Sequence, residues 1–275
     1  MNFFQRVIDK FRNKLNLEQE MVIKKKAISI CSDFETLILG TSCAYYGYRP
    51  NQNELNLAIG SQDLYTSYNL YKKLEHKNLK NIIISYSVFS QGFTLIRTHD
   101  RERSVWYKLL YGIEYQYPEI AKENNLYNKE KSISDCLNGY TRDLTIKPTY
   151  RGEQFQYKKR KIDKDNVKIV AGKHLKNNRR EDSQVRYCDM LSNDTKDKNI
   201  NVYIVIFPRP DFYRQFLPKK EELFKDIYDV CKKYNHVRIL DYYDSQDYGA
   251  DDFCDDSHLT LDAAVRFTDC IRKNM

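Results

Sequence analysis

Apolar residues in this 275-residue chain gather in short runs that are separated by longer amphipathic stretches. Several of these runs are apolar nearly throughout, which is typical of strands in a parallel sheet with helices on both faces. We expect strands at Thr36–Leu39, Leu55–Ile59, Asn81–Ser85, Asn199–Phe207 and His236–Leu240. The pattern therefore predicts an α/β protein.

Between and after these runs, apolar residues recur every three or four positions, which is the period of a helix that packs one face on a core. The helices predicted in this way are Asp63–Leu74, Val167–Leu191, Lys219–Tyr234 and Leu261–Lys273, and the second of them is unusually long. The chain contains no internal repeat and no Gly/Ser-rich linker. We therefore expect one large domain over residues 27–275.

Residues 104–164 interrupt this alternation because they are tyrosine-rich, polar and only weakly periodic. Such a segment could form an inserted cap over the sheet or a set of long loops. In either case we expect an insertion within the same domain.

The first 26 residues are predicted to form an amphipathic helix and a lead-in to the domain. The apolar face of this helix consists of Phe3, Phe4, Val7, Ile8, Phe11 and Leu15. The stretch lacks the uninterrupted apolar segment and the cleavage site of a secretory signal, and no run in the chain approaches the ~20 apolar residues that span a bilayer. We expect a cytoplasmic protein whose first helix packs on its own domain, with peripheral attachment to the inner membrane surface as the alternative.

The composition, with 41% hydrophobic and 31% charged residues, fits a soluble globular protein. The seven cysteines are odd in number and scattered without any Cys-x-x-Cys, so we expect reduced thiols, no disulfide framework and no metal site. Part of the net charge of +8 lies in basic clusters at Lys158–Lys161 and Lys173–Arg180. We interpret these clusters as solvated faces, and we expect no nucleic-acid partner.

A serine follows the first predicted strand, at the edge of a parallel sheet where ligands bind. The strand ends in Gly40, and Thr41 and Ser42 come directly after it. Gly40 permits a tight strand-to-helix turn, and backbone N–H groups at the start of the next helix could hold an oxyanion. Taken alone, a serine at such a turn is more often an ordinary helix cap.

A histidine with an acid three residues before it precedes the last predicted helix. This pair is Asp255 and His258, and taken alone it could be a capping loop with an exposed histidine. On an α/β sheet, however, it would lie at the same edge as Ser42. Asp255 could then accept a hydrogen bond from one imidazole nitrogen and fix the tautomer, so that the other nitrogen removes the Ser42 proton.

At these positions the chain resembles blocks I, II and V of the SGNH (GDSL-type) hydrolases. The resembling segments are Gly40–Cys43, Asn56–Gln62 and Phe253–Leu259. The similarity in the order of elements runs from about Ala27 to the C-terminus, apart from the insertion, and is greatest to the bacterial branch that adds O-acetyl groups to polysaccharides or removes them. The resemblance implies a three-layer α/β/α sandwich with a flavodoxin-like parallel sheet in the strand order 2-1-3-4-5.

The resemblance also implies a role for each site residue. Ser42 would be the nucleophile, His258 the general base and then the general acid, and Asp255 the residue that orients His258. Backbone N–H groups of Ser42 and of either Gly60 or Ser61 would form the oxyanion hole, since block II can be aligned in two ways that differ by one residue.

The chain departs from the family pattern after the third strand, where an asparagine usually supplies a third oxyanion donor. Tyr86 or Ser87 could replace that donor, or both could be ordinary loop residues. Gln62 and Arg209 are further candidates for contact with substrate. Arg209 could bind an anionic group there, or it could pair with Asp211.

The function that the resemblance implies is serine-dependent acyl transfer. We expect an O-acetyltransferase that acts on a capsule or surface-polysaccharide sugar or its precursor, with a glycan as acceptor and acetyl-CoA as acyl donor, and with no bound cofactor. One alternative is a carbohydrate esterase or deacetylase that uses the same three residues. Another is a glycan-binding protein on a catalytically impaired SGNH scaffold.

Overall fold

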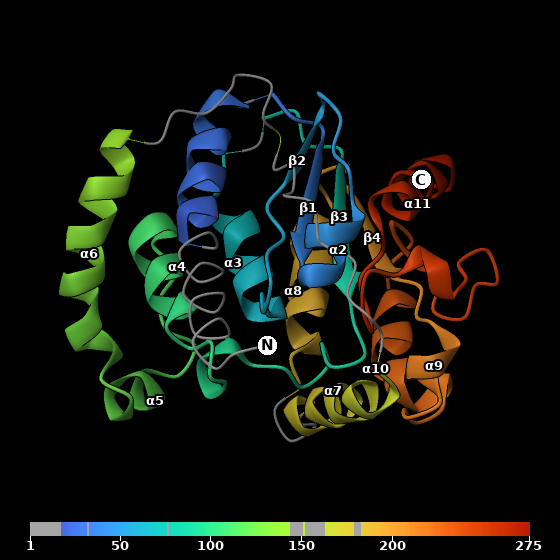
Figure 1. Cartoon of the computed structure of the whole chain (residues 1–275). Coiled ribbons are helices and arrows are strands. Elements are labelled where there is room, and N and C mark those ends of the chain that lie inside the picture. Colours follow the sequence, from blue (N-terminus) through green and yellow to red (C-terminus); the bar gives the residue numbers. More distant parts are fainter. Residues whose placement is uncertain (1–17, 32, 76, 144–150, 152–162, 179–182) are drawn as a thin grey trace.

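The computed structural model describes residues 18–31, 33–75, 77–143, 151, 163–178 and 183–275. Within these residues the centre of the molecule is a five-stranded parallel sheet in the order β2-β1-β3-β4-β5 (Figure 1). Its strands are β1 (Thr36–Gly40), β2 (Glu54–Asn56), β3 (Asn81–Tyr86), β4 (Asn201–Ile206) and β5 (Val237–Asp241). The predicted fold class and strand order are confirmed.

Helices cover both faces of the sheet. The chain passes from β1 to β2 in one direction and from β2 through β3 and β4 to β5 in the other, so right-handed crossovers place the connecting helices on opposite faces. Helices α2 (Ser42–Gly47) and α11 (Leu261–Lys273) pack together on one face. Helices α3 (Leu64–Lys73), α8 (Val185–Thr195) and α10 (Lys220–Cys231) form the other layer.

The strands are buried on both faces, as their continuous apolar runs predict. All five residues of β1 are buried, and the side chains of Leu37, Ile38 and Leu39 have no exposed surface. Ile83 of β3 lies beside Ile38 on one side and beside Tyr203 on the other. This close-packed core fixes the positions of the strand ends. The candidate site residue Ser42 follows the carboxyl end of β1.

The second strand is shorter than predicted, because it ends at Asn56 instead of continuing to Ile59. Bonds to β1 continue past this end, from the Leu57 N–H to the Ile38 carbonyl at 2.8 Å and from the Ile59 N–H to the Gly40 carbonyl at 3.3 Å. The side chain of Asn56 binds the backbone around the strand end. Its Oδ1 accepts from the N–H of Ala58 at 3.0 Å, and its Nδ2 donates to the carbonyls of Ala44 and Tyr48.

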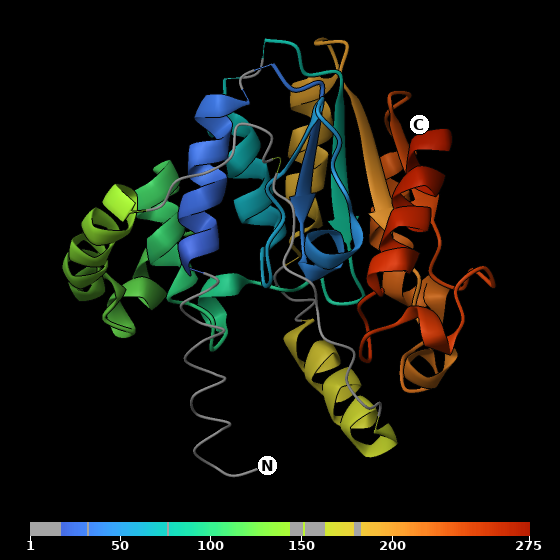
Figure 2. The same ribbon diagram turned by 45° about the horizontal axis from the view of Figure 1, so that its top comes forward.

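The prediction of one long helix over Val167–Leu191 is wrong. Helix α7 (Lys164–Asn177) ends first, and α8 begins only at Val185. Both sides of the break are bound to the loop after β3: Asn178 Nδ2 donates to the Val88 carbonyl at 3.1 Å, and the Gln184 N–H donates to the Gln91 carbonyl at 2.7 Å. In both views α7 lies beyond the carboxyl ends of the strands (Figures 1 and 2).

The described part of the predicted insertion is helical and does not form long loops. It contains α4 (Arg103–Tyr111), α5 (Pro118–Glu123) and α6 (Leu126–Asp143). These helices lie outside α3 and do not cap the sheet (Figures 1 and 2). They enclose a small core of their own, which consists of Ile96, Val105, Tyr115, Ala121 and Leu126.

Residues 18–30 form a helix that packs on the main core through Met21, Val22 and Ala27. The predicted apolar face between Phe3 and Leu15 and the basic cluster at 158–161 lie outside the described residues. In the described part of the chain, no helix combines the length and the apolar character needed to cross a membrane.

Candidate active site

Ser42 is the first residue of α2, directly beyond the carboxyl end of β1. The turn depends on Gly40, which has φ = 110°, and a Cβ atom there would come within 2.6 Å of the Ser85 carbonyl oxygen. Thr41 caps the helix, because its Oγ1 accepts from the N–H of Cys43 at 3.3 Å and bonds to Ser85 Oγ at 3.2 Å. The turn therefore leaves the half-buried Ser42 side chain at the sheet edge.

His258 lies in a closed loop before α11. The loop is held by an antiparallel bridge between Phe253 and Leu259 and by a hydrogen bond of 2.7 Å from the Cys254 N–H to the His258 carbonyl. Asp255 organises its tip, since Oδ1 accepts the backbone N–H groups of Ser257 and His258, each at 2.9 Å. One carboxylate thus shapes the backbone on which the histidine stands.

The structure brings Ser42, His258 and Asp255 into one hydrogen-bonded chain across 216 positions of sequence. His258 Nε2 lies 2.8 Å from Ser42 Oγ, and His258 Nδ1 lies 3.0 Å from Asp255 Oδ2. The side chains of His258 and Asp255 are 15% and 13% exposed. This is the geometry in which an imidazole can take a proton from a serine hydroxyl while a carboxylate orients the ring.

The charge on Asp255 suits that arrangement. Burial raises the pKa of the Asp255 carboxyl, but the neighbouring His258 and the two backbone N–H donors together lower it by more than burial raises it. The pKa of Asp255 therefore lies well below its usual range. Asp255 is therefore ionised at neutral pH and accepts a hydrogen bond from Nδ1–H, which leaves the lone pair of Nε2 directed at Ser42. Burial and the charge of Asp255 raise the pKa of Asp256, the next residue.

The Gly60–Ser61 turn lies beside the turn that carries Ser42. The Ile59 N–H donates to the Gly40 carbonyl at 3.3 Å, and the Gly40 N–H donates to Gln62 Oε1 at 2.5 Å. No acceptor for the backbone N–H groups of Ser42, Gly60 or Ser61 is found among the residues that the structure describes. These groups are the donors that the sequence predicts for an oxyanion.

Gln62 does not contact the site as a substrate-binding residue would. Its side chain is 1% exposed. Besides the bond from Gly40, Oε1 accepts from Ser67 Oγ at 3.1 Å, while Nε2 donates to the Leu57 carbonyl and to Tyr107 Oη, each at 3.1 Å. The amide is fully used inside the protein, so Gln62 links the Ser42 turn to the block II loop.

Arg209 is likewise buried, at 4% exposure, and does not face outward as an anion-binding residue. Its Nη1 donates to the Ser257 carbonyl at 2.8 Å, and its Nη2 donates to Cys43 Sγ and to Ser87 Oγ, each at 2.8 Å. The predicted alternative, a pair with Asp211, is not formed either, since Arg214 binds that carboxylate. We call Arg209, Cys43, Ser87 and Ser257 the arginine bracket.

Neither replacement considered for the third oxyanion donor is placed to serve. Ser87 Oγ belongs to the arginine bracket, and the Ser87 N–H donates to Ser90 Oγ at 2.8 Å. Tyr86 is 1% exposed, and its ring packs against Phe224 with the ring centroids 6.1 Å apart. Both residues are buried by the strand and loop that carry them.

Comparison with known proteins finds similarity to solved structures. No protein-family model matches the chain, and no curated protein matches it. Among solved structures, it is similar to a crystal structure described as a candidate acylhydrolase from Bacteroides fragilis, with 8% sequence identity and a TM-score of 0.41. That match covers 87% of this chain and 85% of the other.

A second histidine, His174 on α7, lies near the site and was missed by the sequence analysis. Its Nδ1 bonds to Tyr213 Oη, and its ring lies against Phe89 with the ring centroids 4.9 Å apart. Burial, followed by the charges of Arg209 and His258, lowers the pKa of His174 to about 3. The imidazole is therefore neutral at pH 7. A histidine inside a lysine-rich helix carries no pattern that would have indicated this position.

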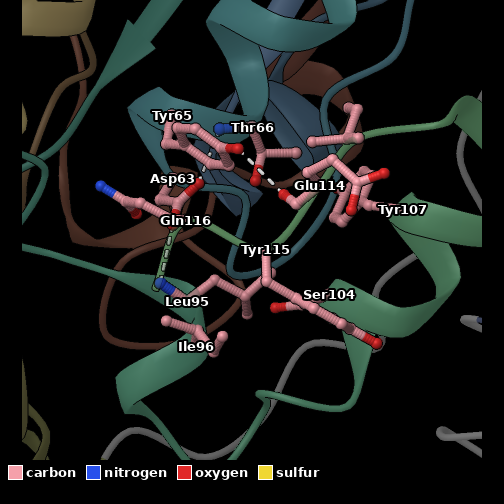
Figure 3. Close-up of a pocket in the computed structure, with 11 residues that line it drawn as sticks. Asp63, Tyr65, Thr66, Leu95, Ile96, Ser104, Tyr107, Glu114, Tyr115 and Gln116 are labelled. Atoms are coloured by element: carbon pink, nitrogen blue, oxygen red, sulfur yellow. Dashed lines mark hydrogen bonds between the residues drawn. The ribbon is translucent and has the colours of Figure 1, made fainter. Parts of the chain in front are cut away.

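A hollow on the α3 side of the molecule is separate from this site (Figure 3). It lies beside Asp63, which caps α3 by accepting the Thr66 N–H at 2.8 Å and also accepts the Leu95 N–H at 2.7 Å. Burial raises the pKa of the Asp63 carboxyl. Neither Ser42 nor His258 lines the hollow.

Proposed function

We propose that the protein is a serine-dependent acyl-transfer enzyme in which Ser42 carries the acyl group. The observation that supports this proposal most strongly is the chain of contacts from Ser42 Oγ through both nitrogens of His258 to Asp255. A serine hydroxyl is a weak nucleophile until an adjacent base removes its proton. The three residues supply the nucleophile, the base and the group that orients the base.

In the proposed first step, Ser42 Oγ attacks the carbonyl carbon of an ester or thioester, and its proton moves to His258 Nε2. The tetrahedral intermediate then breaks its bond to the leaving group, which takes the proton from His258. Ionised Asp255 stabilises the imidazolium that exists between these events. The products are an acyl-Ser42 ester and a free alcohol or thiol.

In the second step, an acceptor hydroxyl attacks the acyl-Ser42 ester and gives its proton to His258 Nε2. The bond from the acyl carbon to Ser42 Oγ breaks, and His258 returns the proton to Ser42. In both steps the N–H groups of Ser42 and of the Gly60–Ser61 turn would hold the negative oxygen. The chemistry thus returns each of the chain's own residues to its starting state.

We further propose that the acceptor is a sugar hydroxyl, which makes the protein a glycan O-acetyltransferase, and that acetyl-CoA is the donor. The acceptor rests on the resemblance to the bacterial O-acetylating branch. The donor is supported by Lys168, Lys173 and Lys176, which are exposed on α7 beyond the carboxyl ends of the strands. Such side chains can bind the phosphates of coenzyme A.

The experiment is incubation of the protein with labelled acetyl-CoA, with and without surface-polysaccharide fragments, followed by measurement of label on protein, glycan and free acetate. We expect label on Ser42 and then on the glycan. Free acetate without a labelled glycan would identify an esterase that uses the same residues. Glycan binding without label on Ser42 from any ester would identify a binding protein. Ser42→Ala should abolish labelling, and Ser132→Ala, an exposed serine on α6, is the matched control.

A further inference from the structure

The Gly60–Ser61 turn is bound by Arg103, the first residue of α4, and by Asp100 in the turn that precedes this helix. Arg103 Nη1 donates to the Gly60 carbonyl at 2.8 Å. Asp100 binds the side chain of the next residue, since its Oδ2 accepts from Ser61 Oγ at 2.7 Å. Asp100 Oδ1 also pairs with Arg103 Nη2 at 3.1 Å, so the turn, the cation and the carboxylate form a closed ring of contacts.

This ring holds a strained backbone conformation. Ser61 has φ = 62°, in the left-handed region, which costs a residue other than glycine roughly 1–2 kcal/mol. Its contact with Asp100 and the Arg103 bond to the preceding carbonyl offset that cost. Strain of this kind is retained where the surroundings over-determine a conformation, and such places cluster at functional sites. The left-handed residue of the turn is Ser61 and not Gly60.

The position of the arginine matters because the Gly60 carbonyl and the Ser61 N–H belong to one peptide group. A charged donor at the carbonyl polarises the whole amide, and hydrogen bonds arranged in series strengthen one another. The Ser61 N–H therefore becomes a better donor at the other end of the peptide. The side chains of Arg103 and Asp100 are 23% and 21% exposed, so solvent screens the pair only in part.

We propose that Arg103, oriented by Asp100, is a positioning residue that makes the Ser61 N–H the second oxyanion donor beside the Ser42 N–H. This inference rests on the proposed acyl-transfer function. It selects Ser61 over Gly60, and it gives the oxyanion a source of positive charge at an edge where Tyr86 and Ser87 are buried. Arg103 acts through the peptide and does not itself contact the substrate.

The test is the hydrolysis of p-nitrophenyl acetate by purified wild type, Arg103→Met, Arg103→Lys and Asp100→Asn. Loss of a whole oxyanion donor costs ~10²–10³ in rate, and we expect loss of its polarisation in Arg103→Met to cost about 10- to 30-fold in kcat. KM should stay within about twofold, because the effect is on the transition state. The pH at which kcat is half-maximal should not move, since His258 and Asp255 are untouched.

Arg103→Lys should recover kcat to within about threefold of wild type, because a lysine restores a charged donor to the carbonyl. Asp100→Asn keeps an acceptor for Ser61 but leaves the arginine unpaired, so we expect an intermediate loss. The matched control is Arg101→Met, because Arg101 donates to the Thr98 carbonyl at 2.7 Å and does not touch the turn. Its kcat should equal that of wild type.

Labelling of Ser42 by a fluorophosphonate separates this inference from the proposed function. If wild-type Ser42 is not labelled, both are overturned. If wild type is labelled and Arg103→Met keeps the wild-type kcat, only the role of Arg103 is overturned. The same holds if Arg103→Lys is as slow as Arg103→Met. If Arg103→Met fails to fold, the other two variants test the role of Arg103. The kcat of Arg103→Lys must then stay near that of wild type, and Asp100→Asn must have a lower kcat at unchanged KM.

Discussion

Two polar clusters lie side by side at the carboxyl edge of the sheet, and they differ in what their side chains leave free. In the first, Ser42, His258 and Asp255 form an open chain that ends at a half-buried hydroxyl. In the second, the arginine bracket, one guanidinium donates to a carbonyl, a thiol and a hydroxyl, and all of these are buried. The first cluster leaves a hydroxyl within reach of solvent, whereas the second uses its polar groups inside the protein.

The two clusters are joined through the backbone. Cys43 of the bracket follows Ser42, and Ser257 of the bracket precedes His258, so Arg209 binds a chain neighbour of each of these two residues. A buried cation is tolerated only where it is well hydrogen-bonded. Arg209 has these hydrogen bonds, and through its partners it connects the β1–α2 turn to the His258 loop.

The largest difference should appear when one serine is removed from each cluster. Ser42→Ala should lower the rate of acyl transfer by at least ~10³ with little change in the free energy of unfolding, because the nucleophile is lost and nothing buried is exposed. Ser87→Ala should change the rate by about threefold or less and cost ~1–2 kcal/mol of stability, because Arg209 loses an acceptor. Esterase kinetics and urea unfolding measure both. Equal rate losses in the two variants would contradict the comparison.

Asp255→Asn should come next, with a loss in kcat of about 10²–10⁴. An amide in place of the carboxylate no longer fixes the His258 tautomer, so Nε2 loses its lone pair toward Ser42. The backbone bonds from Ser257 and His258 can still reach the remaining oxygen, so the loop should stay folded. The measurement is kcat for an acetyl ester, with the near-UV circular dichroism spectrum as a check on the fold. A rate close to that of wild type would remove Asp255 from the mechanism.

Arg209→Met should show the reverse pattern, with stability as the main loss. The Ser257 carbonyl, Cys43 Sγ and Ser87 Oγ would lose their donor inside the protein, at a cost of ~2–4 kcal/mol in urea unfolding. Arg209→Lys should recover only part of this, because an ammonium lacks the planar fork that reaches all three acceptors. The bracket would have no structural role if Arg209→Met unfolded at the same urea concentration as wild type.

The smallest effect that we predict is a pH-dependent stability contribution from Asp255 in the first cluster. The pKa of Asp255 is lower in the folded protein than in the unfolded chain, where it is ~3.9. Its contribution is therefore complete above about pH 4 and is lost as the pH falls toward the folded value. The stability gap between wild type and Asp255→Asn, on the order of 1 kcal/mol at pH 7, should narrow between pH 4 and pH 3. A gap that stays constant over this interval would contradict the assigned shift.

The apolar runs predicted the sheet well because both faces of its strands are dry. The order 2-1-3-4-5 was implied by the resemblance alone. Two errors have local causes that periodicity does not show. At the end of β2 the Asn56 side chain binds the surrounding backbone, and the helix predicted over Val167–Leu191 is divided where the loop after β3 binds Asn178 and Gln184.

At the site, motif spacing was enough to place Ser42 and His258 together, while their catalytic roles stay a prediction. The sequence does not distinguish polar side chains that face a crevice from those whose hydrogen bonds are all made to other residues of the protein. Gln62 and Arg209 were candidates for contact with substrate, yet each is bonded throughout to the protein. Arg103 gave no signal, because its contact with the Gly60 carbonyl spans two elements.

The most direct test of the central claim is the rate at which a fluorophosphonate labels Ser42, located by mass spectrometry of the digested protein. We predict a single labelled serine, Ser42, in wild type. In His258→Ala the labelling should be at least ~10²-fold slower, since the hydroxyl has lost its base. Labelling on another serine, or labelling of Ser42 at the wild-type rate in His258→Ala, would contradict the account.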